Sequence, residues 1–64
     1  MSTLRILLAD DHALVRQGLR RILESHGDFE VVAEAGSGTE AVEQARRHKP
    51  DLAILDVGMR ELNG

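Results

Sequence analysis

Three short apolar stretches of the chain alternate with two stretches that have the residue spacing of amphipathic helices. The apolar stretches are residues 4–9, 29–35 and 52–56. Runs this short, bounded by polar residues, are typical of strands, and the first and last predict strands buried on both faces. The middle stretch is rich in β-branched residues but contains Glu30 and Glu34, so we expect it to be less buried and to lie at a sheet edge.

The first helical stretch runs from about His12 to Ser25. Its apolar residues recur on one face, with charged residues on the other, and they are Leu14, Val15, Gly18, Leu19, Ile22 and Leu23. Asp10 or Asp11 can cap the start of this helix, because aspartate is favoured at that position. Gly27 is a natural stop after its end.

The second helical stretch runs from about Thr39 to His48 and places Ala41, Val42 and Ala45 on its inner face. Ser37 and Glu40 have the spacing of a capping box, in which the side chain of each residue satisfies the free backbone N–H of the other. Pro50 ends the helix, since proline disfavours helical backbone in the residue before it.

The element order is therefore βαβαβ, and this alternation implies parallel strands joined by right-handed crossovers. Parallel pairing would bring the carboxyl ends of the strands, and with them Asp10, Asp11 and Asp56, to one edge of the sheet. Like charges repel and raise each other's pKa, so three clustered carboxylates need a cation. Helix capping is the alternative explanation for the acidic pair, but it leaves one carboxylate unexplained.

Composition limits the classes of function. The chain has 64 residues, no cysteine and a formal net charge of −3, from 8 basic and 11 acidic residues. A single small domain without disulfides is expected, and the absence of cysteine fits a reducing compartment. The chain lacks the excess of basic residues that nucleic-acid binding needs. No apolar run approaches the roughly 20 residues that span a membrane. We therefore expect a cytoplasmic location and no membrane partner.

The motifs at residues 6–12 and 15–19 resemble the opening of bacterial response-regulator receiver domains, in particular of the NarL/FixJ (LuxR-type) subfamily of two-component systems. Residues 27–35 and 50–56 resemble the same family. The resemblance implies one half of a flavodoxin-like (CheY-like), doubly wound α/β sheet with strand order 2-1-3. In such a sheet ligands bind beyond the carboxyl ends of the strands, where the strand order reverses.

The resemblance also implies roles for the acidic residues. Asp56 would be the phosphoacceptor, and Asp10 and Asp11 would be the acidic pair that holds Mg²⁺, with Asp56 and the backbone carbonyl of Gly58 as further ligands. The phosphoryl donor would be a sensor histidine kinase, which makes the chain a phosphoacceptor rather than a turnover enzyme. One departure is Arg60, which stands where the family commonly has proline. Without the proline the loop backbone is less restricted, so we expect a less ordered loop around Gly58.

By the same resemblance, residues 1–64 are expected to form a partial receiver domain with three strands and two helices. The later strands of a receiver, which carry a Ser or Thr and a Lys, have no counterpart here. Neither does the DNA-binding domain through which a parent protein would control transcription. The sequence leaves open the input signal, the target genes, and whether this half can be phosphorylated.

Several of these residues also have simpler interpretations. His12 is interpreted as a partly exposed residue of the first helical turn, and Gly36-Ser37-Gly38 as a turn with a helix cap rather than a phosphate loop. Arg16, Arg20 and Arg21 fit a solvated helix face, with kinase contact as the alternative. A competing function is a binding module that self-associates, or exchanges half-domains, through the exposed edge of the third strand. Cobalamin-binding and haloacid-dehalogenase-type motifs do not match the spacing of the acidic residues.

Overall fold

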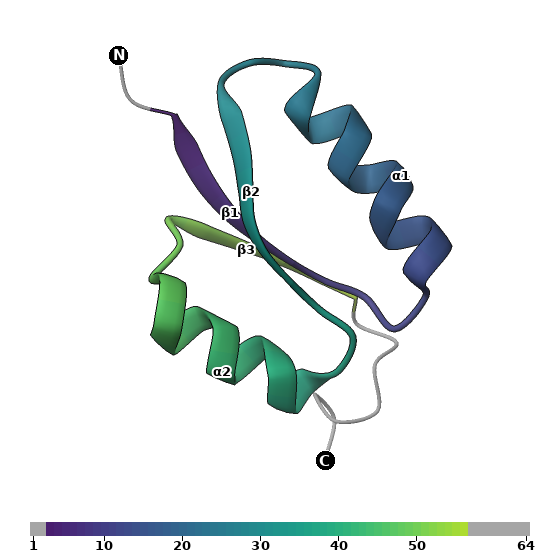
Figure 1. The fold of residues 1–64 in the computed structure, drawn as a ribbon, viewed down its shortest axis with the longest axis vertical. Helices are drawn as coiled ribbons and strands as arrows, with labels where there is room; N and C mark the ends of the chain where they lie inside the picture. The colour runs from purple at the N-terminus through teal and green to yellow at the C-terminus, as the bar shows by residue number, and fades with distance from the viewer. Residues whose placement is uncertain (1–2, 57–64) are drawn as a thin grey trace.

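The computed structural model describes residues 3–56, which form a three-stranded parallel sheet with a helix on each face. The elements are β1 (Leu4–Ala9), α1 (Ala13–Glu24), β2 (Phe29–Ala35), α2 (Gly38–His48) and β3 (Leu52–Leu55). The strand order is β2-β1-β3, and α1 and α2 lie on opposite sides of the strands (Figure 1). The expected α/β architecture and the strand order 2-1-3 are confirmed.

The central strand β1 is the most buried element of the fold. Its residues Ile6, Leu7, Leu8 and Ala9 are all buried, because β1 has a strand on each side and a helix over each face. On the face that α2 covers, a cluster of mostly small side chains packs together, namely Leu7, Ala9, Ala33, Ala35 and Ala41. Such small side chains let the helix backbone approach the sheet closely.

The two edge strands differ in burial, and in the opposite sense to the sequence-based prediction. β2 lies at an edge as expected, yet Val31, Ala33 and Ala35 are buried. β3 contains no buried residue: Leu52 and Leu55 are 46% and 43% exposed. The prediction of a third strand buried on both faces is therefore wrong for residues 3–56, since both helices pack mainly against β1 and β2.

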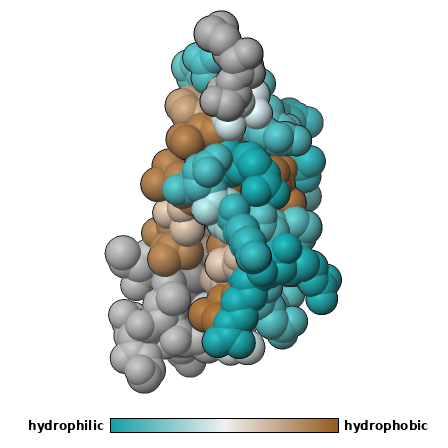
Figure 2. All heavy atoms as spheres, turned by 90° about the vertical axis from the view of Figure 1, so that its left-hand side faces the viewer, coloured by the Kyte–Doolittle hydropathy of each residue, from teal (hydrophilic) through white to brown (hydrophobic). Residues whose placement is uncertain are grey.

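The exposure of β3 leaves an apolar surface on the side of the molecule where β3 and α2 lie. Seen from that side, hydrophobic residues form a column next to a strip of hydrophilic residues (Figure 2). An apolar cavity of about 170 Å³ opens here, and it is lined by Leu7, Ala41, Val42, Ala45, Ala53 and Leu55. Val42, which the sequence placed on the inner face of α2, is 52% exposed, whereas Ala41 is buried as expected.

The apolar face of α1 is also more exposed than its pattern suggests. The helix has no buried residue, and Leu14 is 82% exposed. Val15 and Ile22 are exposed as well, while Leu19 and Leu23 are half-buried. In the described part of the chain, α1 therefore covers the sheet with only a narrow part of its apolar face.

The two helices differ in how their first backbone N–H groups are capped. Ser37 caps α2, since its hydroxyl oxygen accepts the N–H of Glu40 at 3.2 Å, and the Glu40 carboxylate accepts the N–H of Gly36 at 2.9 Å. The predicted Ser37 cap is confirmed, but Glu40 bonds the N–H of Gly36 instead of that of Ser37 as the capping box predicts. The helix begins at Gly38. His12, rather than either aspartate, occupies the N-cap position of α1, and its side chain makes no capping bond. Neither described helix is long and apolar enough to cross a membrane.

Candidate functional site

The carboxyl edge of the sheet brings together the three aspartates that the sequence placed there. Asp10 directly follows β1, and Asp56 directly follows β3, whose last residue Leu55 pairs with Ala9. The backbone N–H of Asp56 donates to the carbonyl oxygen of Ala9 at 2.9 Å, which fixes the two strand ends side by side. One carboxylate oxygen from each aspartate and Nδ1 of His12 all lie within 4.8 Å of one another.

Asp10 is the buried member of this acidic site. Its Oδ1 accepts the backbone N–H of His12 at 2.8 Å, so the carboxylate closes a tight turn at the start of α1. This hydrogen bond lowers the pKa of Asp10 below its ordinary value, against the opposing effect of burial. Asp10 is therefore a fixed negative charge at neutral pH, whereas Asp11 and Asp56 are more accessible to solvent.

His12 contributes a nitrogen atom that the sequence interpretation left out of the site. Its Nδ1 lies 2.8 Å from Oδ1 of Asp11, 3.2 Å from Oδ1 of Asp10 and 3.9 Å from Oδ2 of Asp56. The side chain is 69% exposed, so the expectation of a partly exposed residue holds beside this contact, although His12 is the N-cap of α1 and not part of its first turn. Its position directly after Asp11 was the one signal in the sequence that could have placed it here.

The carboxylates therefore converge on a common point, and a positively charged group is favoured there. The donor set is mainly carboxylate oxygen, which is the ligand type that Mg²⁺ prefers over nitrogen or sulfur. Mg²⁺ held by these residues would keep some of its ligand positions for water. Gly58, the other predicted ligand, lies outside the described residues.

Two arginines of α1 have partners that the sequence did not reveal. Arg16 Nε donates to Oε1 of Glu34 at 3.0 Å, and Arg20 Nη1 donates to Oε2 of the same carboxylate at 2.6 Å. The hydrogen bond that Arg20 donates to Glu34 raises the pKa of Arg20, and Glu24 adds to the effect. The interpretation of a simply solvated face is therefore wrong for Arg16, which is half-buried, whereas Arg20 and Arg21 are exposed as that interpretation expects.

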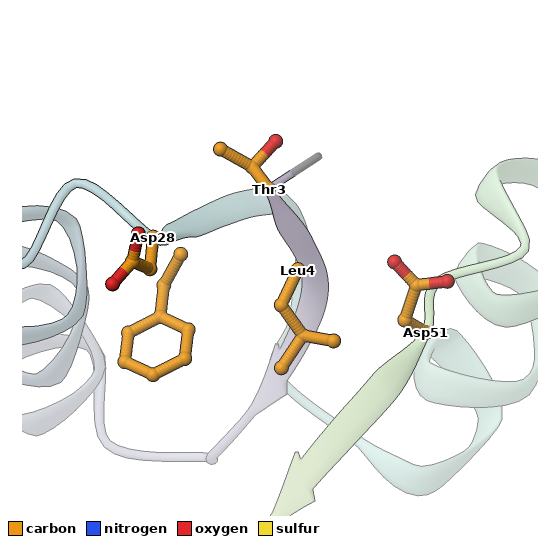
Figure 3. Close-up of a pocket in the computed structure, with 5 residues that line it drawn as sticks. Thr3, Leu4, Asp28 and Asp51 are labelled. Atoms are coloured by element: carbon orange, nitrogen blue, oxygen red, sulfur yellow. The ribbon is translucent and has the colours of Figure 1, made fainter. Parts of the chain in front are cut away.

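A larger cavity, of about 510 Å³, lies at the opposite edge of the sheet, where the strands begin. Thr3, Leu4, Asp28, Phe29 and Asp51 line it, and Asp28 and Asp51 lie on either side of Leu4 (Figure 3). Asp51 has a structural task, since its Oδ2 accepts the N–H of Arg5 at 2.9 Å and so ties the start of β3 to β1. The three neighbouring carboxylates at the carboxyl edge remain the better candidate site.

Comparison with known proteins identifies the family and the fold. Residues 6–64 match the response regulator receiver domain family, which covers nearly the whole chain. The chain belongs to the receiver domain family. The signal receiver domain of the putative response regulator NarL from Mycobacterium tuberculosis superposes with a TM-score of 0.90 at 40% identity, over 94% of this chain and 48% of that one.

Curated relatives extend well beyond the length of this receiver sequence. A nitrate/nitrite response regulator protein homolog of Haemophilus influenzae is 46% identical over 61 residues, which is 95% of this chain and 29% of that protein. The receiver domain of CheB from Thermotoga maritima has a TM-score of 0.86 at 41% identity, over 91% of this chain and 43% of that one. The predicted response-regulator receiver of the NarL/LuxR type is confirmed.

Proposed function

We propose that this receiver accepts a phosphoryl group on Asp56 in a Mg²⁺-dependent reaction, with a sensor histidine kinase as the donor. The observation that carries the proposal is the convergence of Asp10, Asp11 and Asp56 within 4.8 Å at the carboxyl edge of a receiver sheet. Residues 1–64 would then act as a partial receiver, since the chain spans about half of the solved NarL receiver. Control of transcription would belong to a longer parent protein.

Asp56 suits the role of acceptor because its side chain is 28% exposed, so a phosphoryl donor can reach it. A carboxylate oxygen of Asp56 would attack phosphorus, the bond from phosphorus to the donor's nitrogen or oxygen would break, and an acyl phosphate would form. The product stays on the protein, so the chain acts as an acceptor and not as a turnover enzyme.

Asp10 and Asp11 would hold Mg²⁺ together with Asp56 and the carbonyl of Gly58. Bound Mg²⁺ would neutralise charge on the phosphoryl oxygens, which is the main need of phosphoryl transfer. Asp10 is ready for this task because its carboxylate is already fixed by the N–H of His12. His12 would have to leave the centre of the site, and its exposed side chain is free to turn towards solvent.

The experiment is intact mass spectrometry after incubation with acetyl phosphate, with and without Mg²⁺. We expect one phosphoryl adduct on the unsubstituted chain (the parent chain) in Mg²⁺ and none on Asp56→Asn. Asp28→Asn is the matched control, because Asp28 is an exposed aspartate at the opposite edge of the sheet. An adduct that persists on Asp56→Asn, or one that forms equally well without Mg²⁺, would refute the proposal.

A second function, self-association through β3, is favoured by the exposure of that strand. In the described residues β3 pairs only with β1, so its other edge offers unpaired backbone N–H and C=O groups. Leu52 and Leu55 together expose slightly less than one whole leucine side chain. Burying that surface on both copies of a dimer would contribute about 3–5 kcal/mol, at about 1.5–3 kcal/mol per leucine.

Sedimentation velocity over a range of protein concentrations tests this second function. We expect a concentration-dependent dimer that Leu55→Lys weakens, because the substitution places a charge on the pairing surface. Leu14→Lys is the control, since Leu14 lies on α1 and is 82% exposed. A parent chain that sediments as a monomer at high micromolar concentration would exclude self-association through β3.

A further inference from the structure

One side chain outside the acidic site connects that site to two other elements. Arg16 lies in α1, one helical turn after His12, and its Nη1 donates to the backbone carbonyl oxygen of Asp10 at 2.6 Å. Its Nε donates to Glu34 on β2 at 3.0 Å. The Arg16 side chain is only 21% exposed, so these contacts are shielded from water more than those of an ordinary surface arginine.

The carbonyl group that Arg16 contacts belongs to the peptide bond between Asp10 and Asp11. That peptide is planar, so the direction of its carbonyl also sets the direction in which the chain enters Asp11. On its other side, Asp10 is held by the sheet, because its N–H donates to the carbonyl of Ala35 at 3.0 Å. Arg16 therefore fixes the carbonyl of the peptide between the two carboxylates, a group for which the sheet provides no bond.

Glu34 holds the Arg16 guanidinium in place, and Gly36 leaves room for it. Glu34 uses its two oxygens for different arginines, Arg16 and Arg20, which restrains the carboxylate against rotation. At Gly36, an added Cβ would lie 3.5 Å from Nη1 of Arg16 and 3.3 Å from Oε1 of Glu40. The missing side chain leaves the space in which the guanidinium and the helix cap sit next to each other.

We infer that Arg16 is a positioning residue for the acidic site: it holds the Asp10–Asp11 peptide so that both carboxylates face Asp56. This inference rests on the function proposed above, in which these carboxylates bind Mg²⁺. Arginine suits the task because its planar, forked guanidinium bonds two acceptors in fixed directions, whereas a lysine ammonium is a flexible point charge. The competing explanation is that Arg16 only ties α1 to β2 through Glu34.

Two substitutions separate these explanations. Arg16→Lys keeps the charge but cannot bond Glu34 and the Asp10 carbonyl with the same geometry. Glu34→Gln removes the ion pair between α1 and β2 but leaves the Arg16–Asp10 bond available. Arg21→Lys is the matched control on an exposed arginine of the same helix.

Mg²⁺ affinity, measured by calorimetry on the full chain, is the first readout. Groups that orient metal ligands typically change metal affinity about 10–100-fold when they are removed. We expect Arg16→Lys to weaken Mg²⁺ binding about tenfold, Glu34→Gln to weaken it less, and Arg21→Lys to leave it unchanged. The second readout needs no metal: the amide NMR resonance of Asp11 should move in Arg16→Lys and stay in place in Arg21→Lys.

The outcomes distinguish this inference from the function on which it rests. If the parent chain binds Mg²⁺ and Arg16→Lys binds it equally well, the positioning role is wrong and the proposed function stands. If Arg16→Lys and Glu34→Gln lower the unfolding midpoint equally, without moving the Asp11 resonance, Arg16 only joins α1 to β2. If the parent chain binds no Mg²⁺ at all, the proposed function fails and the inference fails with it.

Discussion

Truncation of a buried leucine and of an exposed one tests the packing of this domain directly. Leu8 in β1 is fully buried, with a relative exposure of 0%, whereas Leu14 in α1 is 82% exposed. The sequence alone placed both in apolar faces. The two substitutions to alanine should therefore differ sharply in their cost if the structure is right.

The expected magnitudes follow from the exposures. Removing a buried leucine side chain from a packed core costs about 2–5 kcal/mol. A 64-residue domain has a total stability of about 3–10 kcal/mol, from about 0.05–0.15 kcal/mol per residue. Leu8→Ala should therefore remove a large share of the stability. Leu14→Ala loses less than a fifth of the burial and gains a good helix former, so we expect a change within about 0.5 kcal/mol.

The assay is urea unfolding followed by far-ultraviolet circular dichroism, since the chain has no Trp and no Tyr to report by fluorescence. With a slope of about 1 kcal/mol per molar urea, Leu8→Ala should lower the midpoint by about 2 M or more. Leu14→Ala should leave it almost unchanged. A loss above about 2 kcal/mol for Leu14→Ala would show that the apolar face of α1 is buried, and would refute the packing described above.

The remaining predictions concern helix ends and the metal. Ser37→Ala should lower the unfolding free energy by about 1 kcal/mol, because the N–H of Glu40 loses its acceptor, and an unchanged urea midpoint would contradict the cap. Lys49→Gly should raise the unfolding free energy by about 1 kcal/mol, since Lys49 has a φ of 48°, which glycine adopts without strain; a lower midpoint would count against it. Mg²⁺ at ten times its dissociation constant should stabilise the chain by about 1.4 kcal/mol, reversibly on chelation. The melting temperature of Asp10→Asn should respond much less to Mg²⁺, and an equal response would place the metal elsewhere.

The local pattern of the sequence was sufficient for the elements and for the acidic site. Short apolar runs and helical spacing predicted the three strands and two helices of residues 3–56, with ends that match the structure or differ from it by one residue. The parallel arrangement followed from the βαβαβ order. It placed Asp10, Asp11 and Asp56 together because Asp10 and Asp56 each directly follow a strand and Asp11 is next to Asp10. The elements depend on neighbouring residues in the chain, and the clustering of the aspartates depends on the direction of the strands. Both can therefore be predicted from the sequence.

The tertiary structure alone decided burial and partners. An apolar run looks the same whether or not a helix covers it, so the exposure of β3 and of Leu14 could not be read from the pattern. The contacts of Arg16 with Glu34 and with the Asp10 carbonyl join residues on different elements, and a polar helix face gives no sign of them. Hydrophobic pattern depends on sequence spacing, whereas packing and hydrogen bonding depend on which surfaces meet in space, and only the folded chain fixes that.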